Sequence, residues 1–161
     1  MTLPGFNMGI RQGDAEREFR THSADETIAA GRLLSNFLRP SQMIVLRGDL
    51  GAGKTTLVKG IAEAFDAALQ EDVTSPTFTL VHEYRGPAVT LFHIDLYRIE
   101  TERELITLGI DDLRSEPASI LLVEWGEKFA QIADQSNGEI AIERVGETER
   151  RIAFRTSASA D

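Results

Sequence analysis

The sequence contains no cysteine, only three histidines and no long apolar run. The absence of cysteine excludes disulfides, thiolate metal sites and cysteine nucleophiles. No stretch approaches the roughly 20 apolar residues that are needed to span a bilayer. Residues 1–11 also lack the charged-then-apolar pattern of a signal peptide. We therefore expect a cytoplasmic protein that does not cross a membrane.

Positive charge is also scarce: 17 lysines and arginines stand against 26 acids, a net charge of -9. A dedicated nucleic-acid binder normally presents a basic face, which this balance disfavours. A metabolic enzyme or a protein-binding partner is the favoured class. The 161 residues, 42% of them hydrophobic, suit one domain that buries its own core. We expect a single domain over 1–161, with the polar ends 1–15 and 156–161 flexible.

Hydrophobic periodicity predicts a helix, a buried strand and a second helix in the first half of the chain. Ser23 is predicted to cap the first helix, with Glu26 completing a capping box. One face of that helix is apolar, and Pro40 ends it; the face consists of Ala30, Leu33, Leu34, Phe37 and Leu38. Further predicted elements are a short edge strand at Glu16–Thr21, a strand at Met43–Arg47 and a helix at Thr55–Phe65.

The second half alternates extended segments with short helices. The predicted elements are strands at Phe78–Tyr84 and Ala88–Ile99 joined as a hairpin, a helix at Thr101–Leu108, a buried strand at Ile120–Trp125, a helix at Gly126–Ala133, and a second hairpin from Glu139–Arg144 and Glu149–Phe154. The predicted fold class is α/β and P-loop NTPase-like. It has a mainly parallel central sheet with antiparallel hairpins and helices on both faces.

A phosphate-binding loop lies between the strand at Met43–Arg47 and the helix that follows it. The run Gly48-Asp49-Leu50-Gly51-Ala52-Gly53-Lys54-Thr55 matches G-x-x-x-x-G-K-[ST] at every fixed position. Its glycines let backbone N–H groups point inward around phosphate oxygens, and the helix start adds partial positive charge. Lys54 supplies an ammonium for the β- and γ-phosphates, Thr55 a hydroxyl for magnesium, and Thr56 a hydroxyl for the α-phosphate. The motif does not distinguish ATPase, kinase and GTPase.

Two acids are candidates to complete this site. Glu124 ends a buried strand, and ligands gather at the carboxyl ends of parallel strands, so we expect it to hold magnesium. An ordinary surface glutamate is the alternative. Asp95 shares one face of its predicted strand with His93 and Tyr97, while Arg98 points the other way. Asp95 is a candidate to orient or deprotonate water, but a solvated strand face explains the pattern equally well.

Hydroxyls gather in the segment before this hairpin. Thr74, Ser75 and Thr77 are candidates to sense the γ-phosphate as a switch does. A turn fixed by Pro76 explains the same pattern. Trp125 is a candidate wall of the nucleotide pocket, with core packing as the alternative.

Four blocks of sequence together resemble the bacterial TsaE (YjeE) family. They are Leu46–Thr56, Ser75–Val81, His93–Arg98 and Val123–Glu127. The resemblance covers about residues 16–154, and the four blocks in this order are highly specific. One departure is Phe65-Asp66 after the P-loop helix, where the family often has Leu-Gly.

The resemblance implies a small ATPase that uses ATP and Mg²⁺ and is weak when isolated. The family works with the TsaD and TsaB proteins, which transfer threonylcarbamoyl to an adenosine beside the tRNA anticodon. By position, Lys54 and Thr55 match the family's phosphate and magnesium residues. Glu124 matches its second magnesium acid, Asp95 its proposed catalytic aspartate, and the 75–77 segment its switch-like loop. With a net charge of -9, we expect tRNA contact mainly through the partners.

Rival functions would use the same loop. A small-molecule kinase needs an arginine-rich lid, and the best place for one, Ile99–Glu116, offers only Arg103 and Arg114. A GTPase normally carries Asn-Lys-x-Asp, but no asparagine here is followed by lysine. A nucleotide-sensing module that binds without hydrolysis is the third possibility. Partner-dependent turnover separates these functions.

Overall fold

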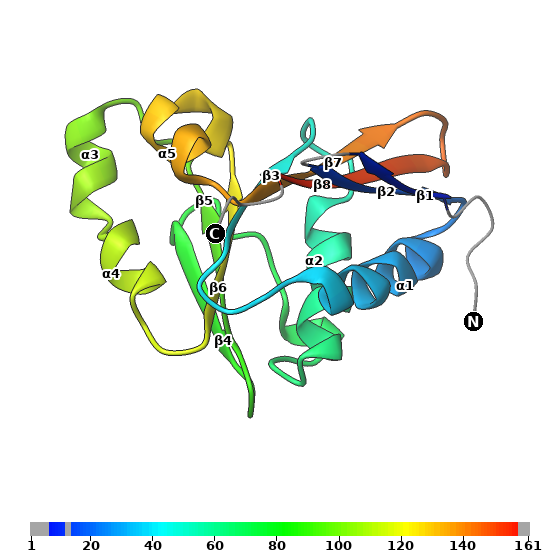
Figure 1. The fold of residues 1–161 in the computed structure, drawn as a ribbon, viewed down its shortest axis with the longest axis horizontal. Helices are drawn as coiled ribbons and strands as arrows, with labels where there is room; N and C mark the ends of the chain where they lie inside the picture. The colour runs from blue at the N-terminus through cyan, green and yellow to red at the C-terminus, as the bar shows by residue number, and fades with distance from the viewer. Residues whose placement is uncertain (1–6, 12–13, 158–161) are drawn as a thin grey trace.

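The computed structural model describes residues 7–11 and 14–157, which form one mixed sheet of eight strands (Figure 1). The spatial order is β1-β2-β8-β7-β3-β6-β5-β4. The strands are β1 (Asn7–Arg11), β2 (Asp14–Thr21), β3 (Met43–Arg47), β4 (Val81–Arg85), β5 (Thr90–Asp95), β6 (Ser119–Glu124), β7 (Gly138–Arg144) and β8 (Arg150–Ser157). Within the described residues no helix is long and apolar enough to cross a membrane.

Parallel pairing occupies the centre of the sheet. Strand β3 pairs in parallel with β6 on one side and β7 on the other, and β5 pairs in parallel with β6. Antiparallel strands flank this centre, with β4 on β5 at one end and β8, β2 and β1 beyond β7 at the other. The predicted α/β class, with parallel central strands and both hairpins, is confirmed.

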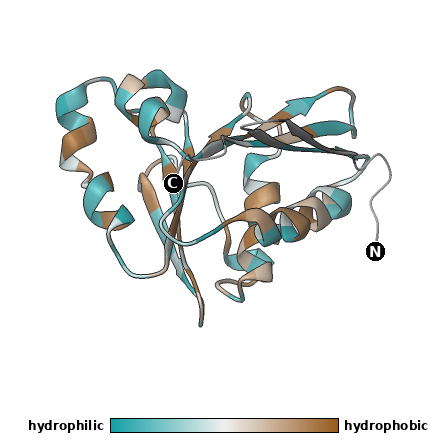
Figure 2. Cartoon of the chain, viewed as in Figure 1, coloured by the Kyte–Doolittle hydropathy of each residue, from teal (hydrophilic) through white to brown (hydrophobic). Residues whose placement is uncertain are grey.

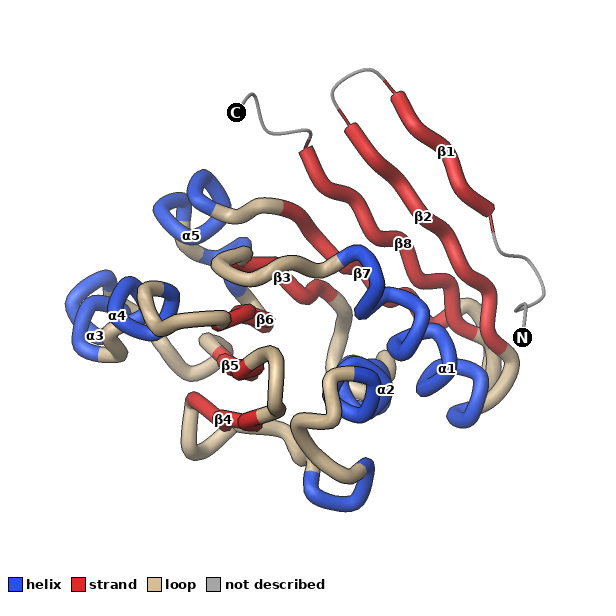
Figure 3. Tube along the Cα trace, turned by 60° about the horizontal axis from the view of Figure 1, so that its bottom comes forward, coloured by secondary structure: helices blue, strands red, loops and turns tan. Residues whose placement is uncertain are grey.

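Helices cover both faces, as predicted (Figure 3). They are α1 (Ala24–Leu34), α2 (Lys54–Ala64), α3 (Glu102–Thr107), α4 (Ile110–Arg114) and α5 (Ala130–Gln135). Single 3₁₀ turns lie at Ser35–Phe37, Gln70–Asp72 and Gly126–Lys128. One apolar core joins α1 and α2 to the sheet, and the other joins α3, α4 and α5 to the opposite face. Hydrophobic residues run along α1 and α2 in Figure 2.

Close contact between α1 and α2 fixes the position of the phosphate-loop helix. A Cβ on Gly60 would fall 1.9 Å from the Ile28 carbonyl oxygen, and one on Gly31 would fall 2.3 Å from that of Leu57. Only glycine therefore allows the two backbones to approach this closely. The crossing places residues 57–61 of α2 directly against α1, which fixes the path of the helix that begins at Lys54.

Helix α2 has the predicted ends to within one residue, but α1 ends at Leu34 and a 3₁₀ turn follows, so Pro40 does not end the α-helix as predicted. Ser23 caps α1 by accepting from the Glu26 amide, but Glu26 reaches back to the amide of His22 instead of that of Ser23. At the end of α2, Asp66 adopts the left-handed conformation with φ 53°. The amides of Asp66 and Ala67 then bond to the carbonyls of Glu63 and Ala62, which closes the helix as a glycine would. The departure from the family's Leu-Gly therefore leaves the helix end regular.

Several predicted boundaries are wrong. Strand β1 lies in the segment 1–15 that was expected to be loose, and it makes β2 an internal strand where an edge strand was predicted; residues 1–6, 12–13 and 158–161 lie outside the described part. The first hairpin is shorter at both ends, because residues 77–79 form a turn and β5 ends at Asp95. Helix α4 was not predicted, and its five residues are too few to show helical periodicity.

Candidate functional site

The carboxyl ends of three parallel strands bring the two candidate acids together. Asp95 pairs directly with Glu124 across β5 and β6, and Glu124 pairs with Leu46 of β3. Because β3 leads into the phosphate loop, both acids lie level with the start of that loop. The sequence placed each acid at a strand end, and the register makes them neighbours.

The phosphate loop has the backbone that its glycines predict. Gly51 and Gly53 have φ values of 79° and 111°, a region that other residues rarely adopt. Helix α2 begins directly afterwards at Lys54, and no side chain caps its Gly53 end. The first amides of a helix have no acceptor inside it, so here they stay available to an anion. The Ala52 carbonyl accepts a hydrogen bond from Arg150 Nε (2.7 Å), which braces the loop from β8.

Lys54, Glu124 and His93 form a buried polar cluster behind this loop. Lys54 Nζ lies 3.3 Å from Glu124 Oε1 and donates to the Gly48 carbonyl at 2.5 Å. His93 Nε2 lies 2.5 Å from the other oxygen, Glu124 Oε2. The exposed fraction is 6% for Lys54, 4% for Glu124 and 0% for His93. Charges this well shielded from water interact strongly. Removing them from water is costly, so such a cluster is unusual in a protein interior.

Burial and partners act in opposite directions on the Glu124 carboxyl. Burial raises its pKa, because the charged form loses water. The hydrogen bond to His93 and the neighbouring charges, including that of Lys54, lower the pKa by more, so it lies below its ordinary value. Glu124 is therefore an anion at neutral pH, the form that can bind a cation.

Asp95 is nearly as buried, at 4% exposed, but different groups hold it. Its Oδ1 accepts from the Tyr97 amide (2.9 Å), and its Oδ2 accepts from the Thr77 hydroxyl (3.3 Å). The Thr77 hydroxyl also lies 2.8 Å from that of Ser75. The hydroxyl segment is thereby linked to the acid. Thr74 is exposed, and its carbonyl instead faces His82 of β4.

A cavity of about 330 Å³ opens between these groups. Its lining comprises Leu50, Gly51, Gly53, Lys54, Thr55, Thr56, Ser75, Thr77, Asp95 and Glu124. The hydroxyl of Thr55 and the carboxylates are hard oxygen donors of the kind that Mg²⁺ prefers. The described residues contain no group of three or more His, Cys, Asp or Glu side chains that could hold a metal alone. This donor set fits Mg²⁺, which commonly combines one or two carboxylates with phosphate oxygens and water.

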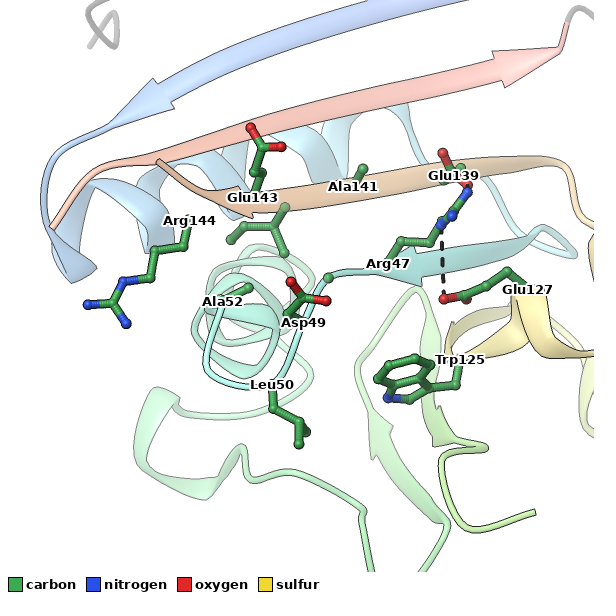
Figure 4. Close-up of a pocket in the computed structure, with 12 residues that line it drawn as sticks. Arg47, Asp49, Leu50, Ala52, Trp125, Glu127, Glu139, Ala141, Glu143 and Arg144 are labelled. Atoms are coloured by element: carbon green, nitrogen blue, oxygen red, sulfur yellow. Dashed lines mark hydrogen bonds and ion pairs between the residues drawn. The ribbon is translucent and has the colours of Figure 1, made fainter. Parts of the chain in front are cut away.

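Two further cavities border the same loop. One of about 250 Å³ shares Gly53 and Thr56 with the first and extends to Ala24 and Thr27 of α1 and Arg150 of β8. The other, about 620 Å³, lies beside β7 and contains neither Glu124 nor Asp95 (Figure 4). We define this larger cavity as the β7 groove; it is lined by Arg47, Gly48, Asp49, Leu50, Ala52, Trp125, Glu127, Glu139, Ala141, Ile142, Glu143 and Arg144.

The residues after Asp95 lie differently from their prediction. Tyr97 and Arg98 belong to a turn, so Tyr97 does not share the strand face of Asp95. The Tyr97 ring packs against that of Trp125, with centroids 5.3 Å apart and planes tilted by 50°, and Arg98 lies over the Phe78 ring at 4.9 Å. Trp125 itself has φ 62°, and Lys54 Nζ lies 4.9 Å from the centroid of its ring. Trp125 lines the β7 groove and does not line the 330 Å³ cavity.

Other residues that support the site carry no sequence signal. Lys128 donates to three carbonyls of the turn after β5, those of Leu96, Tyr97 and Ile99. A lone lysine in a 3₁₀ turn gives no indication of such a role. Arg114, the candidate lid residue, instead bonds to the Ser41 carbonyl and the Asn137 side chain, at the amino ends of β3 and β7. It therefore lies at the end of the sheet opposite the two acids.

The fold and site define an α/β protein with a candidate anion and cation site at the carboxyl ends of its parallel strands. The family model "Threonylcarbamoyl adenosine biosynthesis protein TsaE" matches residues 21–152. The chain therefore belongs to the TsaE family, which confirms the resemblance seen in the sequence.

Individual relatives agree with this assignment. A protein of Bacillus subtilis (strain 168), named tRNA threonylcarbamoyladenosine biosynthesis protein TsaE, is 39% identical over 137 residues, covering 85% of this chain and 84% of the relative. A protein of the same name from Treponema pallidum (strain Nichols) is 33% identical over 132 residues, covering 82% and 95%. The crystal structure of Bacillus subtilis YdiB superposes with a TM-score of 0.66 at 33% identity, covering 88% and 86%.

Proposed function

We propose that this chain is a Mg²⁺-dependent ATPase that supports threonylcarbamoyladenosine formation in tRNA together with the TsaD and TsaB proteins in the cytoplasm. The observation that carries the ATPase is the buried contact between Lys54 of the phosphate loop and Glu124 at the end of β6. The tRNA role rests on the names of the relatives. The cavity between Lys54, Thr55, Glu124 and Asp95 is the proposed triphosphate site.

Each residue has a distinct part in hydrolysis. The loop amides and Lys54 bind the phosphates. To do so, Lys54 gives up its contact with Glu124 and contacts the β- and γ-phosphate oxygens instead. Thr55 and Glu124 would hold Mg²⁺, which would supply positive charge to the phosphate oxygens. Asp95 orients the attacking water and accepts its proton. The water oxygen bonds to the γ-phosphorus while the bond from that phosphorus to the β–γ bridging oxygen breaks, giving ADP and phosphate. Ser75 and Thr77 adjoin Asp95, where they sense the γ-phosphate.

The nucleoside extends from the triphosphate site into the 250 Å³ cavity beside α1. Support comes from Thr56, which lines both cavities and lies where the α-phosphate contact is expected. Ala24 and Thr27 form the wall on the α1 side. This direction leaves the γ-phosphate end facing Asp95 and Glu124.

Exposed apolar side chains support the partner part of the proposal. Leu50, which is 71% exposed, lines the triphosphate cavity, and Phe78, which is 82% exposed, follows Thr77 of the same lining. Large apolar side chains left exposed beside a binding cavity are candidate contacts for a partner protein. Proteins docked there would cover the γ-phosphate end and exclude water from it. The tRNA is contacted through these partners, given the net charge of -9.

An ATPase assay of the chain with and without TsaD and TsaB tests the proposal. We expect slow release of phosphate from the isolated chain and stimulation by the partners in the presence of Mg²⁺. Activity only with an added small acceptor would identify a kinase, against which the position of Arg114 already argues. Tight nucleotide binding without turnover in the complete complex would identify a sensing module. Either result would overturn the ATPase.

A further inference from the structure

His93 is a fully buried polar residue to which the proposed hydrolysis gives no task. It lies on β5, pairs across the sheet with Leu122 of β6 and His82 of β4, and is 0% exposed. Its Nε2 lies 2.5 Å from Glu124 Oε2. An ionised carboxylate only accepts hydrogen bonds, so the imidazole must donate through Nε2.

The other ring nitrogen makes this arrangement costly. His93 Nδ1 is buried and has no hydrogen-bond partner among the residues that the structure describes. A buried polar atom without a partner destabilises the fold. An apolar side chain would fill the interior of β5 without this penalty, as Leu91 does two residues earlier. The imidazole is therefore best explained by what its Nε2 does to Glu124.

The hydrogen bond from His93 fixes the orientation of the Glu124 carboxylate. With Oε2 held by His93, the other oxygen, Oε1, faces Lys54 Nζ at 3.3 Å, beside the triphosphate cavity. We propose that His93 is a positioning residue: it holds Glu124 so that Oε1 points at the divalent cation accompanying the nucleotide. A carboxylate ligand oriented in this way binds a cation more tightly, since less freedom is lost on binding. The inference rests on the proposed Mg²⁺-nucleotide site.

Asp95 provides an internal contrast. It lies on the same strand face two residues from His93, yet Thr77 and the Tyr97 amide hold its carboxylate. Loss of His93 should therefore weaken cation binding through Glu124 without releasing Asp95. The role is specific to one of the two acids.

Matched substitutions separate positioning from packing. His93→Gln keeps a donor near the Nε2 position, whereas His93→Asn keeps polar atoms only near Nδ1. We expect His93→Asn to weaken Mn²⁺ binding to the protein–ADP complex about tenfold or more, and His93→Gln to stay within about threefold of the parent chain. Mn²⁺ binding is measured by electron paramagnetic resonance, and ADP affinity is measured separately in EDTA. ADP affinity should be unchanged in both variants, as it should in the exposed control His22→Gln.

A double-mutant cycle shows whether the effect passes through Glu124. In a Glu124→Gln background, His93→Asn should weaken Mn²⁺ binding no further, because the carboxylate it positions is gone. If His93→Asn does not fold, His93→Leu replaces it as a donor-free variant that fills the buried position. Equal Mn²⁺ affinity in the parent, Gln and Asn chains, equal losses in Gln and Asn, or additive losses in the double variant would each overturn the inference. Failure of the parent to bind ADP with Mn²⁺ would instead overturn the proposed function.

Discussion

An ion pair between a basic residue and a glutamate lies on each side of the phosphate loop, but one pair is buried and the other is exposed to solvent. Towards β6, Lys54 and Glu124 pair at 6% and 5% side-chain exposure. Towards β7, Arg47 pairs with Glu139 at 3.0 Å, but the two side chains are 50% and 35% exposed (Figure 4). Water screens the second pair and barely reaches the first. The proposed chemistry is therefore assigned to the β6 side because its charges are buried, although the β7 groove is the larger space.

The largest expected effect is on the buried side, at Asp95. We expect Asp95→Asn to lower ATP turnover in the partner complex about 100-fold or more, because the water loses its orienting carboxylate. Nucleotide affinity should stay within about threefold, as the phosphates are held elsewhere. Phosphate release and nucleotide titration measure the two quantities. Asp112→Asn on α4 is the control, and normal turnover by Asp95→Asn would refute the catalytic role.

Lys54→Ala should produce the next largest effect. Loss of a charge-assisted contact of about 2 kcal/mol would weaken MgATP binding about 30-fold. Isothermal titration calorimetry measures the change. Lys59→Ala, on the same helix but bonded to the Gln70 carbonyl, should bind normally. Equal affinities for the two variants would show that the triphosphate lies elsewhere.

Replacing one alanine by tryptophan in each neighbouring cavity decides which of the two cavities binds the nucleoside. Ala24 lines the cavity beside α1, and Ala141 lines the β7 groove. We expect Ala24→Trp to weaken ATP binding at least about tenfold, equivalent to about 1.4 kcal/mol, because the indole fills the space. Ala141→Trp should leave the affinity within about twofold. The reverse result, by the same titration, would place the nucleoside in the β7 groove.

The smallest effect is expected on the exposed side. Glu139→Gln removes the charge from the pair with Arg47 and should change the free energy of unfolding by less than about 1 kcal/mol. Turnover should not change. Urea unfolding and the ATPase assay provide both measurements. A large loss of activity would mean that the two sides of the loop share the chemistry.

Local patterns in the sequence predicted the parts of the fold that depend on nearby residues. The strand β3 was predicted to the residue, because a short apolar run between Pro40 and a glycine loop allows little else. The Ser23 cap and the phosphate loop depend on side chains and φ angles within a few residues. Strand β1 and helix α4 were missed, since segments of five residues are too short to show a clear periodicity and acquire structure from their neighbours.

The candidate site also has features that the sequence predicted and features that only the structure revealed. The sequence alone identified the loop residues and placed Asp95 and Glu124 at strand ends. It left His93, Tyr97 and Arg98 without roles, because alternation along a strand does not reveal what faces it across the sheet. The parallel register of β5 on β6 made Asp95 and Glu124 neighbours. The same pairing buried His93 beside Glu124, and Lys54 reached that carboxylate from α2.

The sequence by itself determined a phosphate loop between a buried strand and a helix, since those requirements are met within one continuous segment. Only the tertiary structure decided on which side of that loop the charged side chains are buried. Lys54 and Glu124 are 70 residues apart in the chain, and no local pattern encodes such a contact. The physical reason is that desolvation is a property of the packed molecule, whereas backbone conformation is largely a property of neighbouring residues.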